Sequence, residues 1–184
     1  MAVYFYKYKK NISKINNIFL FFGGHDHKKL TIKILNILGK NDLSLNIFVS
    51  KLFKNLINKI KINKKIIYYD QKQYIKKLNF CKIAITAGGM SLFDNIVMKK
   101  KIICIPQYKH QEINAKKIAS KNAINLLDSN NKNFEKKFNE IFIKLYNDVS
   151  SNNIITLKQN KISNMQKLHK TLILIGKIYA ESKN

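Results

Sequence analysis

Short apolar runs alternate along the chain with stretches in which apolar residues recur at every third or fourth position. The first run, residues 18–22, ends in a Gly-Gly pair, which is typical of a buried parallel strand that enters a turn. Apolar positions over residues 30–38 then share one helical face, and this helix is expected to stop at Gly39. By the same criteria strands are expected at residues 18–22, 45–49, 65–69, 83–87, 102–105 and 123–127. Helices are expected at residues 30–38, 52–60, 71–78, 91–98, 111–120, 134–149 and 157–180.

This alternation predicts an α/β fold, a doubly wound Rossmann-like parallel sheet of about six strands. Right-handed crossovers place helices on both faces of such a sheet, and ligands bind at the carboxyl ends of its strands. Residues 1–17 are expected to form an amino-terminal extension or connector, residues 18–150 the Rossmann-like domain, and residues 151–184 a carboxyl-terminal helical segment.

Composition supports a packed domain, because 46% of the residues are hydrophobic. No apolar run reaches the ~18 residues of a transmembrane helix, and residues 1–10 lack the pattern of a signal peptide. A cytoplasmic protein is therefore expected. Cys81 and Cys104 lie far apart in strand-like segments, as buried reduced thiols would, and their spacing indicates no metal site.

The formal net charge of +25 would by itself suggest a nucleic-acid partner. All 35 basic residues are lysines, however, and they are spread over the whole chain. A selected nucleic-acid site would be expected to contain arginine for bidentate contacts. The charge therefore indicates general use of lysine at solvated positions and no specific nucleic-acid site, although it would attract a dianionic ligand.

Glycine turns follow two of the expected strands and are the first candidate binding elements. Gly23 and Gly24 allow the backbone to approach a ligand closely. The helix that follows would offer free amide groups to an anion, and Asp26 can cap it. His25 and His27 flank Asp26; they can relay protons or bind metal, or they are simply exposed loop histidines. A tight turn without a ligand is an equal alternative.

The second turn, residues 86–94, has the sequence TAGGMSLFD. Thr86 and Ser91 carry hydroxyl groups that can donate to phosphate oxygens beside the amides of the turn. Asp94 follows Ser91 by three positions. It can therefore complete a capping box, or it can accept hydrogen bonds from ribose hydroxyls.

A third polar cluster follows Pro106, the only proline of the chain. Gln111 and Asn114 are three positions apart and share a helix face. Their carboxamides can donate and accept hydrogen bonds, which suits sugar hydroxyls or an N-acetyl group. Solvated polar residues without a ligand would show the same pattern.

Together the three segments resemble the carboxyl-terminal domain of GT-B-type proteins. The shared motifs are GG-x-D-x-K-x-LT after the first strand, AGG-x-S-L-x-[acidic] after the fourth and Q-x-x-NA after the fifth. Within that superfamily they are most similar to the UDP-sugar hydrolase of pseudaminic acid biosynthesis, UDP-2,4-diacetamido-2,4,6-trideoxy-β-L-altropyranose hydrolase. The second and third motifs are also similar to glycosyltransferase family 28, which includes the peptidoglycan N-acetylglucosaminyltransferase. The resemblance covers residues 18–180.

The resemblance implies a UDP-sugar as the ligand, with no cofactor and no metal. It places Gly23 and Gly24 at the floor of an interdomain cleft, Asp94 where the transferases have a ribose-binding Glu, and Tyr69 near the base. The diphosphate would be bound through the backbone amides of Ala87, Gly88, Gly89, Met90 and Ser91.

Gln111 and Asn114 would face the sugar or its phosphate. No residue clearly fills the role of a general base, and His25 and His110 are the only local candidates.

Some positions depart from the pattern of these families. His25 and His27 stand where the hydrolase usually has Ser and Pro, and Met90 replaces a small residue. Asp94 is one methylene shorter than the usual Glu. These families also have an amino-terminal Rossmann domain, for which residues 1–17 leave no room.

Several functions therefore stay open. The first is the UDP-amino-sugar-binding half of a UDP-sugar hydrolase that needs an amino-terminal domain for catalysis. The alternatives are the carboxyl-terminal subunit of a split UDP-GlcNAc-type transferase, a non-catalytic binding module, or a surface that binds polyanions. The expected protein partner is a separate chain carrying the amino-terminal domain, or a second copy of this chain.

Overall fold

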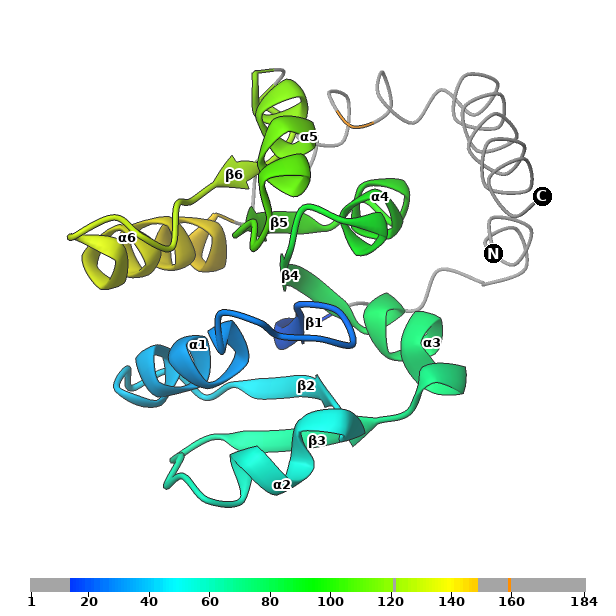
Figure 1. Cartoon of the computed structure of the whole chain (residues 1–184). Helices are drawn as coiled ribbons and strands as arrows, with labels where there is room; N and C mark the ends of the chain where they lie inside the picture. The colour runs from blue at the N-terminus through cyan, green and yellow to red at the C-terminus, as the bar shows by residue number, and fades with distance from the viewer. Residues whose placement is uncertain (1–13, 121, 149–158, 160–184) are drawn as a thin grey trace.

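The computed structural model describes residues 14–120, 122–148 and 159 (Figure 1). One sheet contains six parallel strands in the order β3-β2-β1-β4-β5-β6. The strands are β1 (Lys14–Phe21), β2 (Asn46–Ser50), β3 (Lys65–Tyr69), β4 (Cys81–Thr86), β5 (Lys101–Cys104) and β6 (Asn125–Leu126). The α-helices are α1 (Leu30–Gly39), α2 (Lys54–Ile57), α3 (Tyr74–Asn79), α4 (Met90–Val97), α5 (Lys109–Ala119) and α6 (Phe134–Asn147), with 3-10 turns η2 (Lys51–Phe53) and η3 (Gln71–Gln73). The predicted doubly wound α/β fold is confirmed.

The strand order creates a switch point between β1 and β4. The chain builds β1, β2 and β3 outward to one edge, then returns to place β4 on the other side of β1. Open α/β sheets bind ligands in the crevice at such a switch point, outside the carboxyl ends of the strands.

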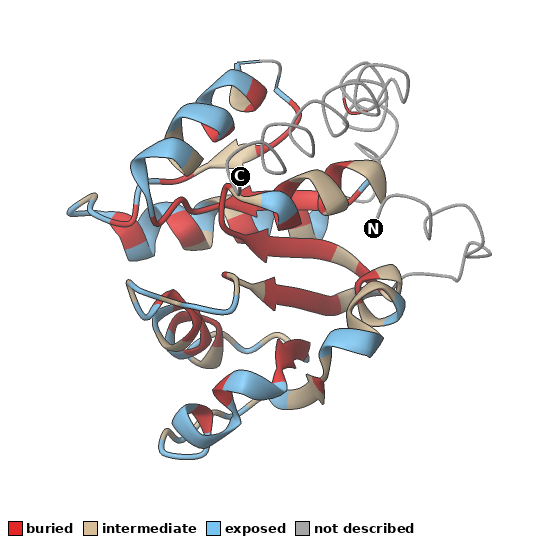
Figure 2. Ribbon diagram, turned by 45° about the vertical axis from the view of Figure 1, so that its right-hand side comes forward, coloured by how far each residue is buried: buried red, intermediate tan, exposed pale blue. Residues whose placement is uncertain are grey.

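Apolar side chains on both faces of the sheet explain why the fold has three layers. Along β1, Ile18 and Leu20 join the core beneath α1 and α6, whereas Phe19 joins the core beneath α3. Helices α4 and α5 cover β5 with a further cluster of apolar residues. Figure 1 shows α1 and α6 together on one side of the sheet, and Figure 2 shows its strands as largely buried.

Several expected elements differ from the structure in length, and the strand expected over residues 123–127 is reduced to the two residues of β6. The first strand begins at Lys14, inside the segment expected to be an extension. The helix expected over residues 52–60 is reduced to η2 and the four-residue α2, and Leu52 and Leu56 are exposed. Only Phe53 and Ile57, four positions apart, are buried, so a short turn is enough to bury the apolar pair.

Cys81 and Cys104 are buried and free, as expected for reduced core thiols. No helix in the described part of the chain is long and apolar enough to cross a membrane. The predicted helix over residues 157–180 lies outside the described residues, apart from residue 159, and so does the segment before residue 14.

Candidate functional site

The two glycine turns lie side by side at the carboxyl edge of the sheet. β1 and β4 are paired in parallel, and their last residues, Phe21 and Thr86, are register partners. The turns that follow them therefore start at neighbouring points of the switch region. Gly23 has φ of 96°, a conformation that L side chains rarely adopt, which explains glycine at this position.

Asp26 occupies the amino terminus of α1. Its Oδ1 accepts a hydrogen bond from the Leu30 amide at 2.8 Å, and its Oδ2 accepts one from the Thr31 amide at 2.6 Å. Asp26 therefore caps α1, as expected. The expectation that this helix offers free amides to an anion is wrong for these two groups, because a carboxylate of the chain already binds them.

Helices α4 and α5 begin at the same edge without any side-chain cap from the described residues. The capping box that the spacing of Ser91 and Asp94 would allow, one of the two interpretations of Asp94, does not form among the described residues. The Ser91 hydroxyl instead lies 2.7 Å from the Thr86 hydroxyl, and both side chains are buried. The backbone at the start of α4, with its partial positive charge, is thus the part of this turn suited to an anion.

Gly88 is the position where the α4 turn touches α5. A Cβ at Gly88 would lie 2.5 Å from the backbone oxygen of Gln111, which is too close for any other residue. A Cβ at Gly89 would lie 3.5 Å from Gln111 Nε2, so the Gln111 carboxamide lies against the same turn. The structure therefore brings together the second and third motifs predicted from the sequence.

Gln107 links the loop after β5 to the loop between β1 and α1. The sequence patterns did not identify it as a site residue. Its buried carboxamide donates to the Phe22 oxygen at 2.7 Å and to the His25 oxygen at 3.4 Å, and accepts from the Lys28 amide at 3.1 Å. Its own backbone N–H donates to Gln111 Oε1 at 2.9 Å. A polar residue directly after the strand-ending Pro106 was the only sequence signal available.

Asp94 lies at the side of α4 that faces α3. Burial raises the pKa of its carboxyl group, and the nearby Tyr74 hydroxyl opposes this shift. The two groups are close enough to influence each other, although the Tyr74 hydroxyl makes no hydrogen bond of ordinary geometry within the described chain. The half-buried Asp94 carboxylate stays a predicted ribose ligand.

Tyr69 requires a correction. Its side chain is 1% exposed and stacks on Phe19 at 5.1 Å between ring centroids, within the core beneath α3. The Tyr69 side chain is therefore a packing residue and is not available at the surface to contact a base.

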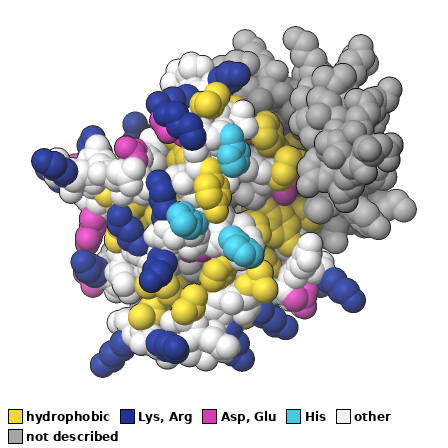
Figure 3. Space-filling model, viewed as in Figure 1, with side chains coloured by type: hydrophobic (Ala, Val, Ile, Leu, Met, Phe, Trp, Pro, Cys, Tyr) yellow, Lys and Arg dark blue, Asp and Glu magenta, His cyan; other side chains and the backbone are white. Residues whose placement is uncertain are grey.

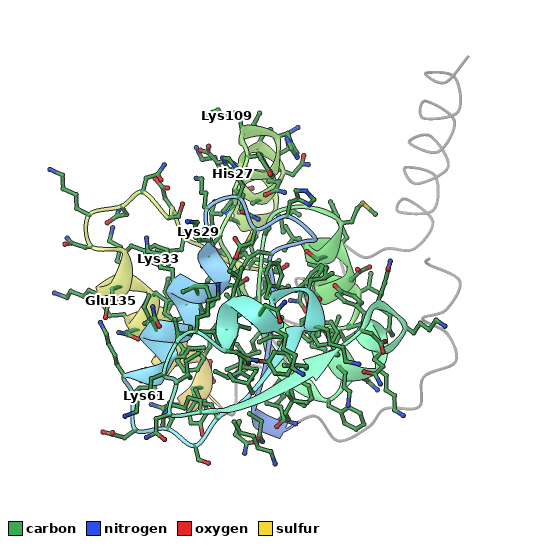
Figure 4. The ribbon with its side chains drawn as sticks, turned by 60° about the horizontal axis from the view of Figure 1, so that its bottom comes forward. His27, Lys29, Lys33, Lys61, Lys109 and Glu135 are labelled. Carbon is green, nitrogen blue, oxygen red and sulfur yellow. The ribbon has the colours of Figure 1, made fainter. Side chains whose placement is uncertain are left out.

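Three histidines gather on one face of the molecule (Figure 3). His25 is exposed in the turn that follows β1. His27 and His110 both stack on Tyr108, with ring centroids 5.9 and 5.6 Å from the Tyr108 ring. Figure 4 shows His27 near Lys109, the first residue of α5. No cluster suited to a metal ion occurs among the described residues.

The site is an open face more than an enclosed pocket. A hollow of about 150 Å³ adjoins it, lined among others by Lys28, Tyr108 and Asp128. This volume is below the ~300–1,000 Å³ of ordinary small-molecule sites. Large apolar side chains are exposed nearby, namely Met90, Tyr108 and Ile113, and Asn114 is exposed on α5.

Comparison with known proteins gives no matching family model and no matching curated protein. Solved structures do match. MurG of Acinetobacter baumannii superimposes with a TM-score of 0.64 at 18% identity, over 82% of this chain and 46% of that one. Spinosyn rhamnosyltransferase SpnG in complex with thymidine diphosphate gives a TM-score of 0.65 at 18% identity, over 87% and 46%. The C-terminal CMP-Kdo binding domain of WaaA from Acinetobacter baumannii gives 0.52 at 8% identity, over 79% and 88%.

The chain thus spans about half the length of the first two neighbours and most of the isolated domain. These identities support a conclusion about fold alone. The described chain has the six-stranded, all-parallel Rossmann-like fold of the carboxyl-terminal domain of GT-B glycosyltransferases.

Proposed function

We propose that this chain binds a nucleotide-sugar, and specifically a UDP-amino-sugar, as the nucleotide-binding half of a GT-B enzyme. The observation that carries the proposal is the start of α4. There a helix terminus that no described side chain caps follows the Gly88–Gly89 turn at the switch point of the sheet, and Gly88 lets this turn pack against α5. Helix amino termini in this setting are suited to bind a diphosphate.

The named neighbours support this reading. One SpnG structure holds thymidine diphosphate, and the WaaA domain is described as binding CMP-Kdo. The latter is a domain without its amino-terminal partner, which supports nucleotide-sugar binding by a single half. The net charge of +25 would add long-range attraction for a dianion.

Each site residue then has a chemical role. Main-chain amides from Gly88 to Ser91 bind the diphosphate and stabilise the charge that develops on it when the sugar leaves. Asp94 accepts hydrogen bonds from the ribose hydroxyls. Gln111 and Asn114 face the sugar or its phosphate, Gly23 and Gly24 form the adjoining floor, and a second domain supplies the acceptor site and general base.

Sugar transfer is the reaction favoured by the named neighbours, which are glycosyltransferases. Hydrolysis of a UDP-amino-sugar, as in pseudaminic acid biosynthesis, is a second candidate. It is favoured by the residues 22–31 segment, where Asp26 binds the Thr31 amide within the GG-x-D-x-K-x-LT motif. The two are separated by whether the complete enzyme releases UDP with water alone or only with an acceptor.

Binding of UDP tests the proposal directly. In calorimetry with the full chain, UDP should bind with a Kd below about 1 mM, and saturating UDP should raise the free energy of unfolding by RT ln(1 + [L]/Kd). Asp94→Asn should weaken binding about fivefold, as expected for the loss of a charged hydrogen-bond acceptor.

Asp42→Asn is the matched control, because Asp42 is exposed in the α1–β2 connection at the opposite edge of the sheet. It should leave the UDP affinity unchanged. No detectable heat with UDP, TDP or CMP at millimolar concentration would refute nucleotide binding by this chain.

A further inference from the structure

Among the described residues of the carboxyl edge, Gln107 makes the most side-chain hydrogen bonds. It is 5% exposed, and its carboxamide uses the oxygen and the NH₂ group on three backbone groups of the β1–α1 loop. β4 lies between β1 and β5 in the sheet. Gln107 therefore ties the two loops that flank the Gly88–Gly89 turn across the end of β4.

This tie also determines which way the Gln111 carboxamide faces. The backbone N–H of Gln107 can only donate, so the atom 2.9 Å from it must be the oxygen of Gln111. The Gln111 NH₂ group is then directed toward the α4 turn, 3.5 Å from the Cβ position of Gly89. With its oxygen already engaged, Gln111 presents hydrogen-bond donors to a ligand.

We propose that Gln107 is a positioning residue that turns the Gln111 NH₂ group toward Gly89, so that the ligand group bound there is an acceptor oxygen. On the proposed function, on which this inference rests, that oxygen belongs to the diphosphate or to the sugar. Gln107 itself is buried, and in this proposal it acts through Gln111.

The test is a double-mutant cycle on UDP-GlcNAc affinity, measured by calorimetry with the full chain. Gln107→Leu should weaken binding about tenfold, because the side-chain hydrogen bonds to the β1–α1 loop fix the backbone N–H of residue 107 that orients Gln111, and leucine cannot make them. In a Gln111→Met background the same substitution should change the affinity by less than about twofold, since the side chain through which it acts is absent. Additive effects of the two substitutions would overturn the proposal.

Asn17→Leu controls for general destabilisation. Asn17 is a buried carboxamide at the amino edge of the sheet, where it donates to the Phe80 oxygen at 3.2 Å and accepts from Asn46 at 2.9 Å. This variant should unfold more easily while keeping the wild-type affinity for UDP-GlcNAc. A drop in affinity equal to that of Gln107→Leu would show that lost stability alone explains the effect.

A readout without ligand separates this inference from the proposed function. In the NMR spectrum of the wild-type chain, the Gln111 side-chain NH₂ should be ordered, with order parameters near those of the rigid backbone. Freely rotating Gln111 NH₂ signals would overturn the orientation by Gln107, even if UDP-GlcNAc binds. Ordered signals with no nucleotide binding would instead refute the proposed function and leave Gln111 without a ligand to contact.

Discussion

Individual polar atoms at the carboxyl edge are largely used within the protein, and this determines what the site can offer. The Asp26 carboxylate is bound to two amides of α1, and the Ser91 hydroxyl is paired with Thr86. Gln111 keeps its NH₂ group while its oxygen is engaged by Gln107. The donors left for a ligand are mainly the backbone amides of the α4 turn and the carboxamides of Gln111 and Asn114, which suit an anion, beside the acceptor carboxylate of Asp94.

Gly88 offers a test at this scale. Gly88→Ala would drive a Cβ to 2.5 Å from the Gln111 backbone oxygen, so the α4 turn must move away from α5. We expect a loss of about 1–3 kcal/mol in the free energy of unfolding, measured in urea, from overpacking against backbone. UDP binding should weaken as well, because the amides of the turn are displaced.

Gly24→Ala is the stability control for this substitution. Among the described residues no atom lies within 4 Å of a Cβ at Gly24, and its φ is not positive. Its effect on unfolding should stay within about 0.5 kcal/mol. Equal effects of the two substitutions would contradict the close contact between the α4 turn and α5.

At the level of elements, two lysines at the start of β5 donate hydrogen bonds to backbone oxygens at the carboxyl ends of helices on opposite faces of the sheet. Lys100 Nζ donates to the backbone oxygens of Asn79, at the end of α3, and Cys81, at 3.2 and 2.7 Å. Lys101 Nζ donates to the oxygens of Leu145 and Asp148 at the end of α6. Buried ammonium groups at helix carboxyl termini satisfy carbonyls that have no helical partner.

Lys100 makes the stability of the fold depend on pH. Burial lowers its pKa from 10.5 to about 8, with the neighbouring Cys81 opposing the shift. Between these two values the unfolded chain binds more protons than the folded chain, so the contribution of this residue to stability rises with pH. The wild type should therefore gain stability relative to Lys100→Met across this window, by up to roughly 1.4 kcal/mol per pKa unit.

The measurement is urea unfolding of both proteins at a series of pH values from neutral to the ordinary lysine pKa. Taking the difference largely cancels the titration of Cys81 and Cys104, whose pKa values are also raised by burial. Parallel curves for wild type and Lys100→Met would show that the Lys100 pKa is not lowered in the folded chain.

At the scale of the whole molecule, the excess of lysine predicts a weak attraction for any polyanion. Binding to DNA should be independent of base sequence and should be lost by about 0.2 M salt, because it depends on counterion release. UDP binding should persist at that salt concentration, since amide contacts at α4 act at short range. Titration of both ligands at low and high salt tests this; sequence-selective DNA binding that survives the higher salt would contradict it.

Most of the fold followed from patterns that are local in sequence. Apolar runs and helical periodicity located every strand and most helices, because burial on both faces of a parallel sheet imposes these patterns on each segment. The prediction of a helix over residues 52–60 was wrong, since apolar spacing does not show which side chains will pack against the core. The apolar pattern likewise did not predict the exact ends of the helices or the start of β1 at Lys14.

The glycine turns of the candidate site could be predicted from local sequence patterns, whereas the positions of individual side chains could not. Gly-Gly pairs after strands one and four mark turns, but only the pairing of β1 with β4 brings them to one edge. The resemblance placed Tyr69, the last residue of an expected strand, near the base, whereas its side chain stacks on Phe19 in the core.

The sequence by itself determined the alternation of strands and helices, the glycine turns and the polar residues that follow them, since each depends on neighbours along the chain. Only the tertiary structure decided which of those polar groups remain available. Asp26, Ser91, Gln107 and Gln111 find their partners through the turn geometry and through contacts between loops, as in the hydrogen bond from Gln107 to Phe22, 85 positions away. A donor or acceptor that is already paired within the fold must give up that hydrogen bond to bind a ligand. Such pairs form between groups that are close in space, and the periodicity of the sequence does not predict which groups these are.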